Sequence, residues 1–147
     1  MGIPIKNIYL SELSFGRTPE VPEKINFTYT ISVGAKVDDS NIGQVNVKVD
    51  VFEKDTNSFK ISCCMIGIFD LSDIKDLPVS IDDFLFVNAP AIIFPYLREL
   101  VSNITLRGSM KALIIPTFNF KEMREKKQQK EKKELEEKNT NQEESKN

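Results

Sequence analysis

The sequence predicts an α+β protein, in which a four-stranded antiparallel sheet is followed by a long helix and a C-terminal helix. Three observations support this prediction. Residues 25–37 are apolar at every odd position, which is typical of a long half-buried strand. Residues 45–51 repeat this alternation. From Leu97 onwards the apolar spacing changes to three and four, as on one face of a helix. Strands first and helices afterwards is an order typical of the α+β class.

Turn residues divide the first part of the chain into four strands. Pro19 and Pro22 mark the loop after the first strand, and residues 38–41 and 54–57 are polar turns. Within the fourth strand the apolar positions change phase near Gly67, which indicates either a bulge or a close approach of the backbone. Consecutive strands with short turns predict antiparallel pairing. The predicted strands are residues 6–15, 25–37, 45–51 and 59–69.

The chain changes character after the fourth strand. Residues 72–83 form a polar connection, and Phe84–Val87 then bring four large apolar side chains together. Proline is tolerated in the first turn of a helix, so we expect Pro95 to open the long helix. The pair Arg107 and Gly108 is a typical C-terminal stop. The apolar stripe of this helix consists of Leu97, Leu100, Val101 and Ile104.

The C-terminal part divides into an apolar segment and a charged segment. Residues 110–120 are apolar and extended in character, whereas residues 121–147 carry nine basic and eight acidic side chains. Residues 121–138 are rich in helix formers, with Glu/Lys pairs at i, i+4. We therefore expect a domain over residues 1–120 and a charged tail over 121–147, a solvated helix that frays into disorder. Its nearly balanced charge disfavours a nucleic-acid-binding arm.

The composition excludes most catalytic chemistry. The chain has no histidine, which removes Ser-His-Asp, Cys-His and histidine–metal sites. Cys63 and Cys64 are adjacent and would point to opposite faces of a strand, so we expect reduced thiols rather than a disulfide or a redox pair. The pairs Asp38–Asp39 and Asp82–Asp83 lie in turn contexts, where carboxylates usually cap. A carboxylate-based or lysine-based enzyme stays open as an alternative, but we predict no catalytic residue, no metal and no cofactor.

Net charge and hydropathy limit where the protein can be located and which classes of partner it can bind. The net charge of −2 offers no electrostatic footprint for nucleic acid. The first ten residues contain no apolar run of signal-peptide length, and no window approaches the roughly 20 apolar residues of a membrane span. We therefore expect a cytoplasmic protein that neither inserts directly into a membrane nor binds nucleic acid.

One segment carries a specific family resemblance. The run Val87–Glu99, with the sequence VNAPAIIFPYLRE, closely resembles the stretch that leads into the long first helix of SecB protein-export chaperones. The resemblance spans about residues 5 to 120, in the family's order and with similar spacing. The other similar segments are Ile8–Phe15, Gly67–Phe69, Arg107–Gly108 and Asn119–Phe120.

The resemblance implies an assembly and a function. SecB proteins form dimers that pair into a homotetramer, with the first helices sandwiched between sheets. The resemblance implies an ATP-independent holding chaperone (a holdase), not an enzyme, that binds unfolded polypeptides or preproteins and keeps them competent for export. It also implies the SecA export motor as a delivery partner. The alternative within the same class is a chaperone of an antitoxin or another dedicated client.

The resemblance also suggests where clients bind. The family has a long client groove between the sheet surface, a crossover loop and the final helix. Aromatic and flexible apolar side chains suit such a groove, because they pack weakly against many sequences. The alternative for each residue is simple core packing. The stripe of the long helix is expected at the oligomer interface. The expected client-binding residues are Ile68, Phe69, Phe84, Phe86, Val87, Met110, Leu113, Phe118 and Phe120.

The expected partner-docking surface departs from the family pattern. SecB proteins that deliver clients to SecA present acidic residues on the outer face of the sheet. This chain has Glu12 at one matching position, but Gly16 beside Arg17 at another, and Lys60 and Ser62 on the fourth strand. An electrostatic dock to a basic partner is therefore weakened.

Two other classes of function stay open at this stage. A carrier of a small apolar ligand or lipid would enclose a cavity between sheet and helix, but the sequence offers no convergent polar anchors for one. An inert assembly subunit would use its apolar surface only between copies. In that case replacing Phe84 or Phe86 with Ser would harm folding or assembly rather than client capture.

Overall fold

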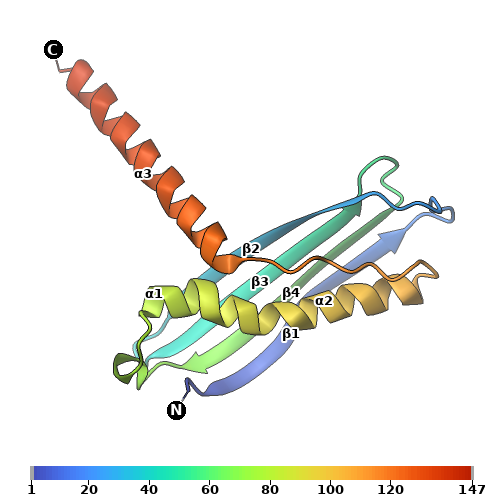
Figure 1. The fold of residues 1–147 in the computed structure, drawn as a ribbon, viewed down its shortest axis with the longest axis horizontal. Helices are drawn as coiled ribbons and strands as arrows, with labels where there is room; N and C mark the ends of the chain where they lie inside the picture. Colours follow the sequence, from blue (N-terminus) through green and yellow to red (C-terminus); the bar gives the residue numbers. More distant parts are fainter. Residues whose placement is uncertain (1, 147) are drawn as a thin grey trace.

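A four-stranded antiparallel sheet forms the first half of the molecule (Figure 1). The computed structural model describes residues 2–146. The strands lie in the order β1-β4-β3-β2, so β1 and β2 are the two edges of the sheet. The predicted α+β class and antiparallel pairing are therefore confirmed. The strands are β1 (Ile5–Arg17), β2 (Phe27–Val37), β3 (Ile42–Glu53) and β4 (Phe59–Asp70).

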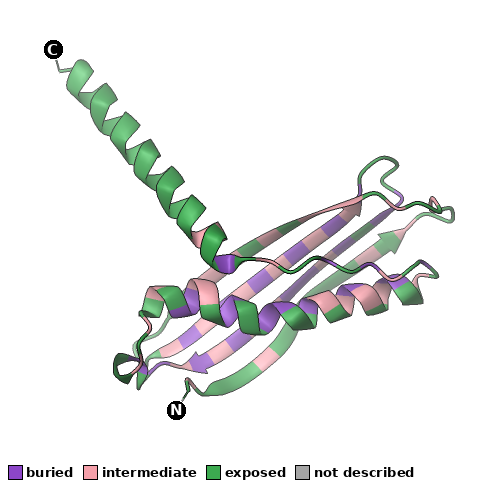
Figure 2. Cartoon of the chain, viewed as in Figure 1, coloured by how far each residue is buried: buried purple, intermediate pink, exposed green. Residues whose placement is uncertain are grey.

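The alternation in the sequence decides which side chains form the core. Val47 lies opposite Met65 and Val49 opposite Cys63, so odd-numbered residues of β3 and β4 share one face. Helix α2 (Ala89–Arg107) packs across this inner face, and the odd-numbered valines of β3 are fully buried beneath it (Figure 2). The burial of each such side chain contributes roughly 1.5–3 kcal/mol. The even-numbered residues form the outer face.

The helical segment begins well before Pro95, so that prediction was wrong. Ser80 caps its start, because the Ser80 hydroxyl accepts a hydrogen bond of 3.0 Å from the N–H of Asp83. Pro95 lies inside α2, on its exposed side. There the ring removes one intrahelical hydrogen bond but displaces no core contact, and packing against the sheet holds the helix. The elements are η1 (Ile74–Asp76), α1 (Ile81–Asp83), a π-helical turn η2 (Phe84–Asn88), and α2.

The end of α2 at Arg107 agrees with the prediction, but the role of Gly108 differs. A Cβ atom on Gly108 would lie 2.7 Å from the ring atom Cζ of Phe15 in β1. The residue with left-handed backbone is Ser109, with φ of 53°, whereas Gly108 has φ of −77°. Gly108 is therefore required for a close approach of helix and strand, and not for its conformational freedom.

Gly67 is also a site of close approach rather than a bulge. The β3–β4 register runs without interruption past Gly67, and the register shifts of the β1–β4 pair lie in β1, at Lys6 and Ser11. A Cβ atom on Gly67 would lie 2.7 Å from Cε2 of Phe69 and 2.8 Å from Cδ1 of Ile93. The bulge predicted at Gly67 was therefore wrong, and the close approach predicted as its alternative is confirmed.

The segment Ile81–Arg107 is long and apolar enough to cross a membrane, by length and composition alone, with a mean hydropathy of 1.4. The prediction that no window approaches such a length was therefore wrong. Of the apolar window, 44% is buried within the molecule. A helix that packs on a sheet meets the same criteria, and this one forms the helical layer of the core.

Helix α3 (Phe120–Glu144) leaves the body of the molecule and projects away from the sheet (Figure 1). The side chain of Asn119 caps its start by accepting a hydrogen bond of 3.1 Å from the N–H of Glu122. Every residue from Glu125 to the end of the helix is exposed (Figure 2). The helix predicted over residues 121–138 is confirmed. The disordered end predicted after it was wrong for residues 139–144, which continue the helix, while residue 147 lies outside the described residues. The division into a domain and a tail at residue 120 stays a prediction.

Candidate functional site

Two of the expected client-binding aromatics lie in the core. The rings of Phe69 on β4 and Phe84 on η2 meet edge to face, with centroids 5.2 Å apart. Phe69 is 0% and Phe84 5% exposed. In this chain they join η2 to the sheet, and neither ring lies on the surface of the single subunit.

A second aromatic cluster fastens α3 to α2. Phe94 of α2 and Phe120 of α3 lie 5.5 Å apart between ring centroids, and Phe118 lies 5.1 Å from Phe120 and 6.3 Å from Phe94. Phe94 and Phe120 are buried and Phe118 is half-buried. The connection between the two helices is therefore anchored at its C-terminal end by aromatic packing.

The first turn of α3 covers Phe86. The guanidinium carbon of Arg124 lies 4.0 Å from the centroid of the Phe86 ring, and Arg124 also forms a 2.7 Å ion pair with Asp82. The Phe84–Val87 cluster is therefore divided, with Phe84 buried in the core and Phe86 and Val87 half-buried at the surface.

The remaining expected client-binding residues lie in two separate places. Ile68 is on the outer face, opposite Asn7 of β1 and Gln44 of β3. Met110 and Leu113 follow α2, are buried, and line the groove described below. The structure does not bring the expected residues together into one surface, and their contact with clients stays a prediction.

The stripe predicted for the oligomer interface faces the chain's own sheet. Leu97 and Val101 are 0% exposed, and Leu100 and Ile104 are half-buried against the same core. Their spacing reflects packing on the inner face of the sheet. The exposed apolar side chains of α2 lie on its other side; they are Ile92, Tyr96 and Leu106.

The outer face around Glu12 has mixed charge. Glu12 is exposed and lies opposite Cys64, and Cys64 lies opposite Lys48, so a lysine rather than a second carboxylate shares this row of the sheet. Gly16 lies opposite Lys60. Ser62 lies opposite Ser14. Arg17 is directed elsewhere, to the end of α2.

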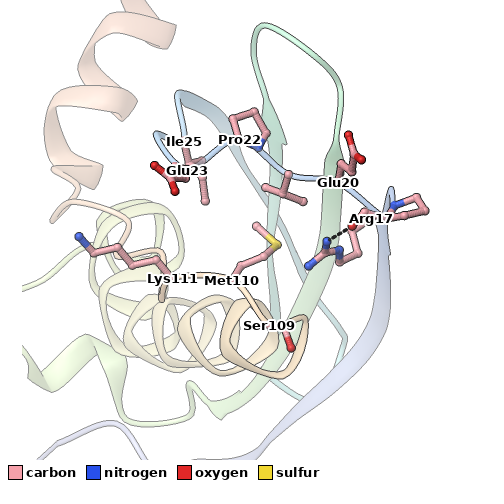
Figure 3. Close-up of a pocket in the computed structure, with 10 residues that line it drawn as sticks. Arg17, Glu20, Pro22, Glu23, Ile25, Ser109, Met110 and Lys111 are labelled. Carbon is pink, nitrogen blue, oxygen red and sulfur yellow. Dashed lines mark hydrogen bonds between the residues drawn. The ribbon is translucent and has the colours of Figure 1, made fainter.

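An open groove lies at one end of the sheet (Figure 3). Residues 18–26, which join β1 to β2, form one wall, and residues 109–114, which follow α2, form the other. The groove has two adjoining hollows of about 510 Å³ and 540 Å³, which share Glu23, Ile25 and Lys111. The apolar side chains that line it are Val21, Ile25, Phe27, Met110, Leu113 and Ile114.

Side-chain hydrogen bonds hold both walls in place. The Arg17 guanidinium donates to the carbonyl of Pro19 at 2.8 Å and also to the carbonyl of Gly108, so it joins the loop to the end of α2. The buried Thr105 hydroxyl accepts a hydrogen bond of 3.0 Å from the N–H of Leu113. These bonds are made from α2 and β1, so the chain's own side chains fix the position of both walls.

The edge of β2 beside the groove carries unpaired backbone groups. The bonds from Lys54 N to Asn26 O at 2.8 Å and from Asp38 N to Ile42 O at 3.0 Å show that even-numbered residues of β2 bond to β3. The odd-numbered residues therefore direct their N–H and C=O groups away from β3. Within residues 2–146, no backbone hydrogen bond joins residues 110–119 to this edge.

Cys63 and Glu53 are ionisable side chains of the sheet whose pKa values are shifted by their surroundings. Burial raises the pKa of the Cys63 thiol to about 12, helped by the nearby charges of Asp50 and Cys64, so this thiol is neutral and a poor nucleophile. The hydrogen bond from the Thr56 hydroxyl lowers the pKa of Glu53, whose carboxylate caps the β3–β4 turn. Among residues 2–146 there is no group of three or more side chains placed to hold a metal ion.

The sequence did not reveal four of the groove residues as candidates. The alternation of residues 25–37 places Ile25 and Phe27 only on the apolar face of a strand. Val21 and Ile114 are not among the predicted client-binding residues. The available signal was the long loop marked by Pro19 and Pro22, which is where chains often place binding surfaces.

Comparisons with known proteins agree on one family. The family model described as "Preprotein translocase subunit SecB" matches residues 1–131. "Protein-export protein SecB" of Orientia tsutsugamushi (strain Boryong) is 31% identical over 134 residues, covering 82% of this chain and 80% of the relative. The protein of the same description from Pseudomonas aeruginosa (strain LESB58) is 31% identical over 125 residues, covering 79% and 75%. A solved Mycobacterium tuberculosis SecB-like chaperone, in complex with a peptide from an antitoxin, matches with a TM-score of 0.66 at 16% identity, covering 80% and 88%.

Proposed function

The chain belongs to the SecB family, and from this membership we propose that it is an ATP-independent holding chaperone that binds unfolded polypeptides. It holds preproteins in a state competent for export, in the cytoplasm, without a catalytic step and without a cofactor. Its binding site is the groove between residues 18–26 and residues 109–114.

The groove beside the open edge of β2 is the observation that carries this proposal. An extended client adds to the edge, and its backbone bonds to the outward groups of Phe27 and Tyr29. Alternate side chains of the client then enter the hollows and contact Ile25, Leu113 and Ile114. Backbone bonding is independent of sequence, which suits a protein that holds many different clients.

The expected affinity is moderate. Burial of one large apolar client side chain contributes roughly 1.5–3 kcal/mol before ordering costs are subtracted. A net hydrogen bond contributes about 0.5–1.5 kcal/mol. Two or three side chains and a few backbone bonds together contribute roughly 5–13 kcal/mol, from which the costs of association and ordering are subtracted, so the net binding free energy is well below this sum.

The test compares two exposed aliphatic residues. Ile114 is 68% exposed in the groove, and Leu135 is 62% exposed on α3, away from it. We expect Ile114→Ser to weaken binding of a fluorescent, permanently unfolded client about tenfold, because it removes one apolar contact of about 1.4 kcal/mol. The matched Leu135→Ser variant should bind the client as the wild type does. Equal affinities of the two variants would show that clients do not use the groove.

The proposal includes assembly into a homotetramer, a dimer of dimers. The apolar surface available for it consists of Ile92, Tyr96 and Leu106 on α2, together with Leu10 and Leu13 on β1, all exposed in the single chain. Four chains of 16.8 kDa have a mass of about 67 kDa. A measured mass of one chain at micromolar concentration would contradict the assembly without affecting the groove.

Two client pathways are distinguished by the outer face of the sheet. Delivery to SecA uses Glu12, and a Glu12→Lys variant should then lose affinity for purified SecA while it retains affinity for unfolded clients. The lysines at positions 48 and 60 favour the second pathway, a dedicated client such as an antitoxin. Wild-type affinity of the Glu12→Lys variant for SecA would exclude Glu12 as the docking residue, whereas failure of the wild-type chain to bind purified SecA would favour the second pathway. A small apolar ligand is the least favoured occupant, because both hollows are open grooves rather than enclosed cavities.

A further inference from the structure

Helix α3 has opposite charge in its two halves. Residues 121–133 contain seven basic and three acidic side chains, a net charge of +4. Residues 134–144 contain one basic and five acidic side chains, a net charge of −4. The two charges cancel in the sum over residues 121–144, which conceals their separation.

Interactions within the chain do not account for this separation. The helix macrodipole disfavours carboxylates in the last turn, where Glu143 and Glu144 lie. Within the described part of α3, the ion pair formed between its own side chains is Lys126 with Glu122, at 2.8 Å. From Glu125 onwards the helix is exposed on all sides, so it has no body contact to stabilise it. A helix that is polar all round usually has a partner or many internal ion pairs.

We propose that α3 pairs in antiparallel orientation with α3 of a second copy of this chain. An antiparallel pair of identical helices has two-fold symmetry, so each contact occurs twice. With the two-fold axis between Lys133 and Glu134, the basic half of each helix lies beside the acidic half of the other. Lys130 of each copy then lies beside Glu137 of the other. These two residues are seven apart and therefore share one face of the helix.

The pairing is weak by itself and operates between copies that another surface already holds together. Exposed ion pairs contribute little individually, and salt screens them over about 8–10 Å. Tethering raises the effective concentration of one helix near the other, so a small attraction is sufficient. Assembly of the body through α2 and β1 supplies the tether, and its mass is measured independently of α3.

Disulfide cross-linking of the full-length chain tests the geometry. In the proposed pair the two copies of residue 133 are offset by only about 1.5 Å along the axis, whereas the two copies of residue 141 are roughly 22 Å apart. We expect Lys133→Cys to form a covalent dimer under mild oxidation and Asn141→Cys to remain monomeric on a denaturing gel. The wild type, which retains the buried Cys63 and Cys64, measures the background. Equal cross-linking at both positions, or none at residue 133, would overturn the proposal.

Charge reversal tests the attraction. In the Lys133→Cys background, Lys130→Glu or Glu137→Lys alone should lower the cross-linked fraction, with about a tenfold loss in the pairing constant, since two symmetric attractions become repulsions. The double reversal should restore it. Lys132→Glu changes the net charge equally but lies on the opposite side of the helix, so it should have little effect. Failure of the double reversal to restore cross-linking would refute the pairing. Retention of heparin by the basic half in place of cross-linking would identify a polyanion as the partner and would also refute it.

Discussion

Leu97 tests whether the apolar stripe of α2 serves the fold of each chain or the contact between chains. Its side chain is fully buried between α2 and the inner face of the sheet. Leu97→Ala removes three carbon atoms, which at about 0.8 kcal/mol each corresponds to about 2.4 kcal/mol of lost transfer free energy. The cavity left behind brings the expected loss in the free energy of unfolding to roughly 2–5 kcal/mol.

The loss is measured by urea unfolding followed by circular dichroism. All variants are compared at one chain concentration, because association couples to unfolding. With a slope of about 1–3 kcal/mol per molar urea, the midpoint should fall by roughly 1–2 M. The matched control is Ile81→Ala at the start of the same helical segment. Its side chain is 46% exposed and lies outside the proposed assembly surface, so the loss should be below about 1 kcal/mol. If Leu97→Ala cost no more than this control but dissociated the assembly, the placement of the stripe against its own sheet would be refuted.

Three further predictions follow from individual side chains. Thr105→Val leaves the N–H of Leu113 without its acceptor and should lower the free energy of unfolding by about 1–3 kcal/mol in the same urea assay. Thr105→Ser keeps the hydroxyl acceptor and should lower the free energy of unfolding much less. The Cys63 thiol, with its pKa raised to about 12, should resist iodoacetamide at pH 8 in the native protein, and rapid labelling by mass spectrometry would contradict its burial. Because the pKa of Glu53 is lower in the folded state than its ordinary value of 4.5, the contribution of Glu53 to stability is complete above pH 4.5. The contribution is lost as the pH falls through the pKa of the folded state. Glu53→Gln should therefore flatten the acid limb of the stability–pH profile, and an unchanged profile would exclude this role.

The sheet could be predicted because each strand obeys a local rule. Residues 25–37 alternate strictly, and that alternation matches the register in which Ile31 lies opposite Val49 and Val33 opposite Val47. Of the two explanations for the phase change near Gly67, the close approach is confirmed and the bulge is wrong, since Ile66 and Ile68 are apolar residues on the outer face of an uninterrupted register. An apolar side chain does not by itself say which face of a strand it occupies.

The start of the long helix could not be predicted from Pro95 alone. Proline at the first turn and proline inside a helix look the same in a short window, and the decision depends on tertiary packing. Ser80 followed by Asp83 was an available capping signal, which the polar character of the surrounding residues concealed.

The groove could not be predicted because it joins segments that are far apart in the sequence. Residues 18–26 and residues 109–114 become neighbours only when α2 crosses the sheet and brings the chain to the end at which β1 finishes. The burial of the predicted aromatic residues is not local either. Phe69, Phe84 and Phe120 are buried in the single chain by contacts that local sequence does not specify, and their contact with clients stays a prediction.

An open sheet edge beside an apolar groove is a risk as well as a binding site, because unpaired edges promote aggregation. The rim of this groove carries Glu20, Glu23, Lys24 and Lys111, and charged side chains beside an edge oppose its pairing with the edge of another sheet. Their opposite signs nearly cancel, so they do not select clients by charge, which a chaperone for many sequences requires. The Arg17 bonds and the Thr105 hydroxyl hold both walls in fixed positions beside the edge. Thr105→Val should therefore lower the free energy of client binding by more than it lowers the free energy of unfolding, since the wall held by the hydroxyl belongs to the groove.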